Sequence, residues 1–131
     1  MKTVIVALVV AFSSAAAIGS AGNLTMFQNE RELAVELPVT LADASSIVPF
    51  IEKAARERGI TRVRAYERDV FIPLEQATLS FVRNGGALTM HVAVESEYRF
   101  AKADRAAALT ELKGMGNAIF VRALALQAAA R

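Results

Sequence analysis

The stretch ATLSFVRNGGALTMHVAV, residues 77–94, decides the fold of this protein. Apolar and polar residues alternate on both sides of the central Asn84-Gly85-Gly86, and a period of two is the spacing of side chains along a β-strand. Asn-Gly supplies the positive backbone angles that a tight hairpin turn requires. The stretch therefore predicts two antiparallel strands joined by a two-residue turn.

Each strand of this hairpin has one apolar face and one polar face. A turn at Asn84 and Gly85 places Ser80 opposite Thr89, whereas a turn at Gly85 and Gly86 shifts the pairing but leaves every residue on its own face. The apolar face, which we expect to be buried, consists of Leu79, Phe81, Leu88, Met90, Val92 and Val94. The polar face consists of Thr78, Ser80, Thr89, His91 and Glu95.

Residues 31–58 predict a strand followed by a helix. In RELAVELPVTL, residues 31–41, apolar side chains again alternate with others. Pro38 has no N–H to give to a ladder, so it marks the end of this strand or an edge of the sheet. Thr40 is a candidate cap for the helix, Ser45 or Ser46 could cap a later start with Pro49 in the first turn, and Gly59 ends the helix.

The rest of the chain predicts one more strand and a helical C-terminus. The strand extends from Ile60 to Ile72, and the alanine-rich segment from Ala101 onward contains good helix formers. Gly114-Met115-Gly116 interrupts that segment, and because each glycine costs about 1 kcal/mol inside a helix, we expect a kink or a break there. Residues 118–126 have an alternative interpretation as a final strand.

The predicted order of elements is β-α-β-β-β-α. It indicates the α+β class, with an antiparallel sheet and helices packed on one of its faces. At 131 residues the chain fits one domain. We expect that domain to comprise residues 23–131.

Residues 1–22 have the pattern of a secretory signal peptide. Lys2 provides a positive start, VIVALVVAF (residues 4–12) is an uninterrupted apolar run, and small residues follow. Cleavage after Ala17 or Ala21 fits this pattern. The sequence therefore predicts an exported protein, periplasmic or secreted.

Two alternatives remain for the N-terminus: an uncleaved membrane anchor and a buried first strand. The apolar stretch from Val4 to Ile18 is shorter than the roughly 20 residues of a membrane-spanning helix. A dinucleotide-binding start is excluded, because Gly19 and Gly22 do not make a G-x-G-x-x-G motif.

Composition removes several classes of chemistry. The chain has no cysteine, which excludes disulfides, thiolate metal ligands and thiol nucleophiles. A formal net charge of +2 gives no global reason to expect binding to nucleic acid. We therefore expect any electrostatic function to be local.

His91 is the only histidine and the one candidate for catalysis. Ser80 and Thr78 are predicted to be its cross-strand or diagonal neighbours, which brings a hydroxyl near an imidazole. No G-x-S-x-G elbow is present, and a flat sheet face offers no oxyanion hole. We therefore predict no catalytic residue, keeping His91 and Ser80 as weak candidates.

A metal site would also depend on His91. Its partners would be carboxylates from Glu95, Glu97 and Asp104, which together make a weak set of ligands. We therefore predict neither a metal nor a cofactor.

TRVRAYERD, residues 61–69, is the strongest candidate for a binding surface. Arg62, Arg64, Tyr66 and Arg68 occupy alternate positions, which on one strand would share a face. Arginine binds phosphate and carboxylate in a bidentate manner, so this face fits an anionic partner.

The alternative is an ordinary solvated strand face. Glu32 or Glu36 on a neighbouring strand would then neutralise the arginines, either within the fold or between two copies of it.

These observations favour a small exported, non-catalytic binding or assembly module that contacts an anionic partner through Arg62, Arg64, Tyr66 and Arg68. The expected partner is another protein or an anionic envelope component, with a homo-oligomer as a further option and no nucleic acid. One alternative is a membrane-anchored accessory subunit of an envelope complex. The other is a small exported hydrolase-like enzyme that uses His91.

Overall fold

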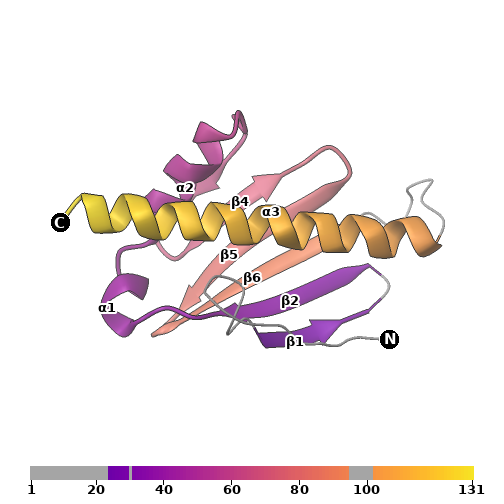
Figure 1. Ribbon diagram of the computed structural model, residues 1–131, viewed down its shortest axis with the longest axis horizontal. Helices are drawn as coiled ribbons and strands as arrows, with labels where there is room; N and C mark the ends of the chain where they lie inside the picture. The colour runs from indigo at the N-terminus through magenta and orange to yellow at the C-terminus, as the bar shows by residue number, and fades with distance from the viewer. Residues whose placement is uncertain (1–23, 30, 95–101) are drawn as a thin grey trace.

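The computed structural model describes residues 24–29, 31–94 and 102–131. They form a six-stranded antiparallel sheet in the order β1-β2-β6-β5-β4-β3, together with three helices (Figure 1). The strands are β1 (Leu24–Gln28), β2 (Glu32–Leu37), β3 (Arg64–Ala65), β4 (Asp69–Pro73), β5 (Ala77–Asn84) and β6 (Ala87–Val94). The helices are α1 (Leu41–Ala44), α2 (Val48–Glu57) and α3 (Lys102–Ala129).

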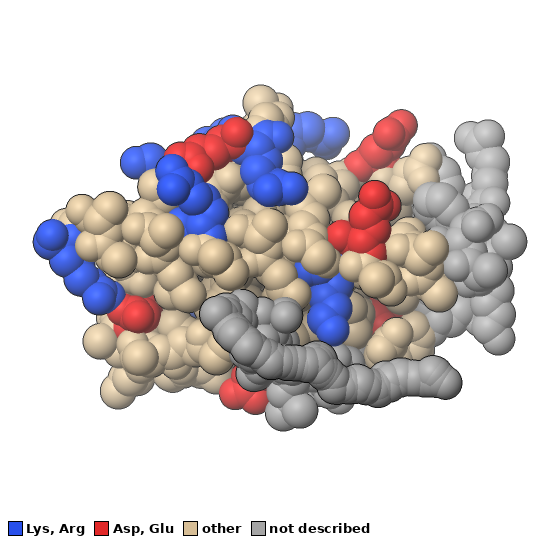
Figure 2. Space-filling model, viewed as in Figure 1, with Lys and Arg blue, Asp and Glu red and all other residues tan. Residues whose placement is uncertain are grey.

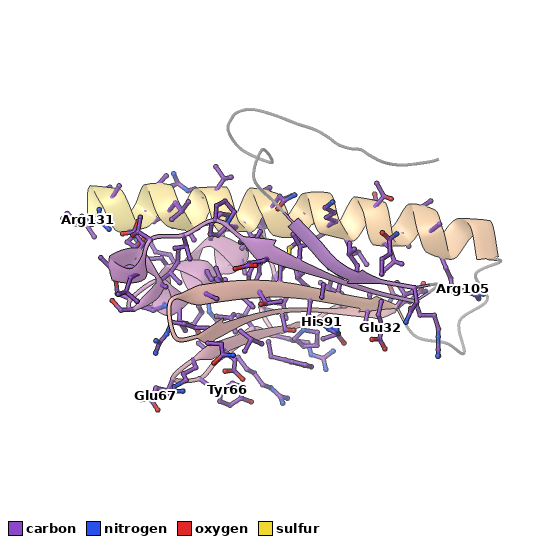
Figure 3. The ribbon with its side chains drawn as sticks, turned by 90° about the horizontal axis from the view of Figure 1, so that it is seen from below. Glu32, Tyr66, Glu67, His91, Arg105 and Arg131 are labelled. Carbon is purple, nitrogen blue, oxygen red and sulfur yellow. The ribbon has the colours of Figure 1, made fainter. Side chains whose placement is uncertain are left out.

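The predicted α+β class is confirmed. Helices α2 and α3 pack against each other and against the same face of the sheet, which we call the inner face. In Figure 3, α3 lies along one side of the sheet, and no helix of the described residues covers the opposite side, the outer face. The core between helices and sheet is apolar, and its largest fully buried side chains include Phe81, Ile47, Ile51, Ile72 and Leu79.

The faces predicted for the central hairpin are confirmed, and its register is now fixed. Asn84 pairs with Ala87, so the turn consists of Gly85 and Gly86. Gly85 adopts a φ of 65°, a left-handed conformation that glycine reaches without steric cost. All six residues of the predicted apolar face are buried; of the polar face, Glu95 lies outside the described residues.

The N-terminal half has the predicted strand and helix, with one additional strand and with the helix in two pieces. The helix after β2 is divided in two, because Pro49 has no N–H and its ring clashes with the preceding turn. Thr40 caps the first piece, where its Oγ1 accepts a hydrogen bond from the N–H of Asp43 at 3.1 Å. An additional strand, β1, pairs with β2. As a result β2 is not an edge strand, and Pro38 follows its last residue, Leu37.

The strand expected from Ile60 to Ile72 is a short hairpin instead. Its two arms are β3 and β4, and the N–H of Tyr66 donates to the carbonyl of Asp69 at 2.7 Å to close the turn. No described strand exceeds eight residues, so a straight strand over this segment would extend past the sheet with unpaired backbone groups. Folding back lets β4 pair along β5 and β3 pair with β4, which satisfies those groups.

Helix α3 is continuous over 28 residues, so of the expected kink or break at Gly114–Gly116 the break was wrong, and residues 118–126 are helical rather than a strand. Gly116 is buried against the sheet, and a Cβ on it would overlap the thioether sulfur of Met90 and lie 3.1 Å from Leu79 Cδ1. The missing side chain lets the helix approach the sheet closely. Packing against the sheet therefore offsets the low helix propensity of glycine.

Two polar contacts fix the C-terminal half of α3. Gln127 is buried, and its Nε2 donates to the carbonyl of Asp43 at 3.0 Å and to Ser46 Oγ at 2.9 Å. One turn earlier, Arg122 forms two hydrogen bonds with the carboxylate of Glu57 on α2, the shorter at 2.8 Å. The helix is thereby joined to both smaller helices.

The two glycines of α3 provide a matched test of the close approach. Gly116→Ala should destabilise the protein by about 1 to 3 kcal/mol because the added methyl group overpacks the core. Gly114→Ala should stabilise it by about 0.4 to 1 kcal/mol, since nothing lies within 4 Å of the new Cβ. Chemical denaturation of both variants measures the difference, and equal stabilisation by both would show that Gly116 is not a close contact.

Candidate functional site

The four predicted binding residues are brought to one short hairpin, although not to one strand. Arg62 precedes β3, Arg64 begins it, and Tyr66 and Arg68 belong to the turn before β4. All four side chains are exposed, and Tyr66 is 57% exposed. The expectation of a single strand face is therefore corrected to an exposed hairpin at the edge of the sheet, which we call the arginine hairpin (residues 62–69).

Alternation explains why Arg62, Arg64 and Tyr66 point away from the core, whereas Arg68 is exposed because it lies in the turn. Val63 on the first arm and Val70 and Ile72 on the second are buried beneath the helices. Arg64 pairs in register with Phe71, which is 38% exposed, so both belong to the outer face. In Figure 3, Tyr66 and Glu67 likewise project on the side of the sheet opposite α3.

Arg56 holds the hairpin in place from α2. Its Nη1 donates to the carbonyl of Thr61 and its Nη2 to that of Val63, each at 3.1 Å, and Nη2 also lies 3.1 Å from Glu52 Oε2. These bonds satisfy carbonyl groups of the chain leading into edge strand β3. Arg56 is therefore a structural cation rather than part of the binding surface.

The remaining charges separate into paired and unpaired groups. Glu57 is paired with Arg122, and the hydrogen bonds from that guanidinium lower the pKa of the Glu57 carboxyl group. By contrast, Arg62, Arg64 and Arg68 form no ion pair with any other described residue, although Glu67 and Asp69 lie in the same turn. Figure 2 shows other basic side chains gathered over α2, whereas the visible surface of α3 is mostly uncharged.

Neutralisation of the arginines by Glu32 or Glu36 within the fold was wrong. Both glutamates lie on β2, and β6, β5 and β4 separate that strand from β3. Four strand spacings amount to about 19 Å, which is too far for an ion pair. The outer face thus has acid on one side, at β2, and base on the other, at β3.

Ser80 and His91, the weak catalytic candidates, do lie together on the outer face. They are direct register partners on β5 and β6, and His91 Nε2 is 3.8 Å from Glu32 Oε1 on β2 (Figure 3). The order hydroxyl, imidazole, carboxylate matches that of a catalytic triad. However, β5 pairs on both sides, so its backbone N–H groups are used in ladders and none is free to stabilise an oxyanion.

No group of three or more candidate metal ligands occurs among the described residues. The side chains of Glu95, Glu97 and Asp104, named as partners for His91, lie outside that part of the structure. Residues 1–22, the predicted signal peptide, also lie outside it.

Two exposed apolar residues of the outer face were not identified from the sequence. Phe71 and Val82 occupy outward positions of β4 and β5 and are 38% and 39% exposed. The alternation itself contained the signal, because the burial of Val70 and Ile72 requires Phe71 to point outward. An exposed aromatic residue beside Arg64 adds apolar area to a charged surface.

No helix in the described residues is long and apolar enough to cross a membrane. Comparisons with protein-family models, with curated proteins and with solved structures found no match to this chain.

The role assigned to Arg56 is tested by comparing it with its neighbour Arg58, which is also exposed. Arg56→Ala removes the bonds to Thr61 and Val63 and should cost about 1 kcal/mol of stability, with faster amide exchange across residues 64 and 65. Arg58→Ala should change stability by less than about 0.5 kcal/mol. Denaturation and hydrogen exchange provide the readouts, and identical exchange in the two variants would contradict the role of Arg56.

Proposed function

We propose that this protein is a small exported, non-catalytic binding module that contacts an anionic partner through Arg62, Arg64, Tyr66 and Arg68. The partner is an acidic protein face or an anionic envelope component. One observation carries the proposal: three exposed arginines on one hairpin have no acidic partner among the described residues.

The chemistry of the hairpin suits such a partner. A guanidinium group donates two parallel hydrogen bonds to a carboxylate or a phosphate. Tyr66 supplies an amphipathic ring between the arginines, and tyrosine is favoured in contact surfaces because it combines apolar area with a hydroxyl group. Because the charges are exposed, binding should weaken as the salt concentration rises.

The remaining hypotheses have less support. A hydrolase using His91 would need an oxyanion site beside Ser80, where the backbone N–H groups are paired. The accessory-subunit alternative required the C-terminal helix to pack on partners, yet Ile119, Phe120 and Ala123 pack in the chain's own core. Nucleic acid is disfavoured by the low net charge and the small number of aromatic residues.

Export is the part of the proposal that rests on the first 22 residues alone. We expect the mature protein to begin after Ala17 or Ala21 and to occur in the soluble exported fraction. Intact mass and N-terminal sequencing of the protein from fractionated cells measure this directly. An intact Met1 in the membrane fraction would favour the anchored alternative instead.

The arginine hairpin is tested with the triple variant Arg62→Gln, Arg64→Gln, Arg68→Gln. If each exposed contact contributes about 0.5 kcal/mol, the triple variant should bind an acidic probe about tenfold more weakly. The probes are a polyglutamate peptide and vesicles containing phosphatidylglycerol, which separate a carboxylate partner from a phosphate partner.

The matched control removes three other exposed cations, at Arg31, Lys53 and Arg58. It changes the net charge by the same amount, so it should retain most of the binding if the hairpin is the site. Equal losses in the two variants would reduce the effect to net charge and would contradict the proposal.

A further inference from the structure

We propose that the anionic partner of the arginine hairpin is a second copy of this chain, docked outer face to outer face about a two-fold axis that follows β5. This inference rests on the proposed function, because it assigns a partner to the same arginines. It also uses the acidic side of the outer face, to which no role has been given above.

The outer face has the character of a contact surface. No described helix covers it (Figure 3). Phe71 and Val82 are each more than a third exposed there. The outward residues of the two central strands, β5 and β6, include no carboxylate and no arginine; they are Thr78, Ser80, Val82, Thr89, His91 and Ala93, and the acidic neighbour of Val82 is Asp69 on β4. A neutral, partly apolar centre with charges at its two sides is the usual anatomy of an interface between proteins.

The charges on the two sides are opposite in sign and cannot meet within one chain. Glu32 and Glu36 lie on β2, while Arg62 and Arg64 lie at β3, about 19 Å away across the intervening strands. Such a surface is complementary to itself. A second copy turned through 180° would bring each acidic side over a basic side, which gives the two ion-pair groups of an isologous dimer.

The strand order determines which two-fold axis works. An axis along β5 places β2 of one copy over β3 of the other and β6 over β4, and leaves β1 at the margin. An axis across the strands would instead place β2 over β2 and bring like charges together. Charge complementarity therefore selects the first arrangement.

The strand register adds apolar contacts to that arrangement. Arg64, Phe71, Ser80 and His91 form one row across the sheet, so Phe71 would contact His91 of the second copy. Val82 lies on β5 in the next row, opposite Asp69 and Thr89, and would meet its own counterpart at the axis. Phe71 and Val82, the large apolar side chains that are exposed on the described strands other than β1, would thus be covered.

The size of the sheet predicts a weak dimer. The overlapping strands, β2 to β3, span four strand spacings, and the longest of them, β5 and β6, have eight residues. The shared face is therefore at most about 500 Å² per copy, or about 1,000 Å² for the pair, which is the size of weak or transient interfaces. We therefore expect dissociation in the micromolar range, with association that weakens as the salt concentration rises.

Reversing the charges on the two sides of the outer face distinguishes a second copy of this chain from any other anionic partner. Arg62→Glu with Arg64→Glu, or Glu32→Arg with Glu36→Arg, should each weaken the dimer at least about tenfold, as measured by sedimentation equilibrium. An equimolar mixture of the two variants should form a heterodimer, and the variant carrying all four changes should dimerise again. Since the reversed residues are too far apart to pair within one chain, recovery can come only from contact between copies.

Three further variants separate the proposed contact from effects on folding and net charge. Lys53→Glu with Arg58→Glu reverses two cations outside the outer face and should leave the dimer intact. Val82→Lys places like charges at the axis and should abolish the dimer, whereas Val121→Lys on the exposed side of α3 should not.

A protein that stays monomeric, or a mixture that fails to recover association, would overturn the inference. If the triple glutamine variant still loses binding to polyglutamate or to the anionic vesicles in that case, the proposed function survives with an external partner. If the triple glutamine variant binds both probes as well as the unchanged protein does, the proposed function fails as well.

Discussion

The contact of Gly116 with the sheet determines which surface of this protein is left for a partner. Without a side chain at this position, α3 lies directly against Met90 and Leu79 and covers the centre of the inner face. The long helix therefore closes one side of a sheet whose other side no described helix covers. Every later feature of the proposed site depends on this asymmetry.

A chain of polar contacts then transmits the position of α3 to the edge of the sheet. Arg122 on α3 binds Glu57 on α2, and the preceding residue of α2, Arg56, binds the carbonyl groups of Thr61 and Val63. These contacts use the cations Arg56 and Arg122 and the carboxylate of Glu57. The arginines that remain on the hairpin have no such internal role, which makes them available to a partner.

The sequence was sufficient to predict the structure where the alternation of apolar and polar residues dominates. Alternation assigned all the large buried residues of β5 and β6, because a period of two leaves no other way to bury Leu79 and Met90; only the small Ala77 was not included. Sequence patterns failed where tertiary packing decides the structure. The glycines of α3 have a low helix propensity, and only the position of Met90 facing Gly116 shows why the helix needs a glycine there. Arg62 to Arg68 were recognised as a surface, yet their separation from Glu36 depends on strand order, which pairing across the whole sheet determines.

The central claim, that the outer face and its arginine hairpin form the contact surface, is tested most directly by amide NMR spectra of the full chain over a dilution series. We expect concentration-dependent shifts in β2, in residues 62–69 and along β5, and none on the exposed side of α3 around Ala118 and Ala125. Shifts confined to α3 would contradict it, because the contact surface would then be the helix. Spectra that do not change with concentration would exclude self-association through either face.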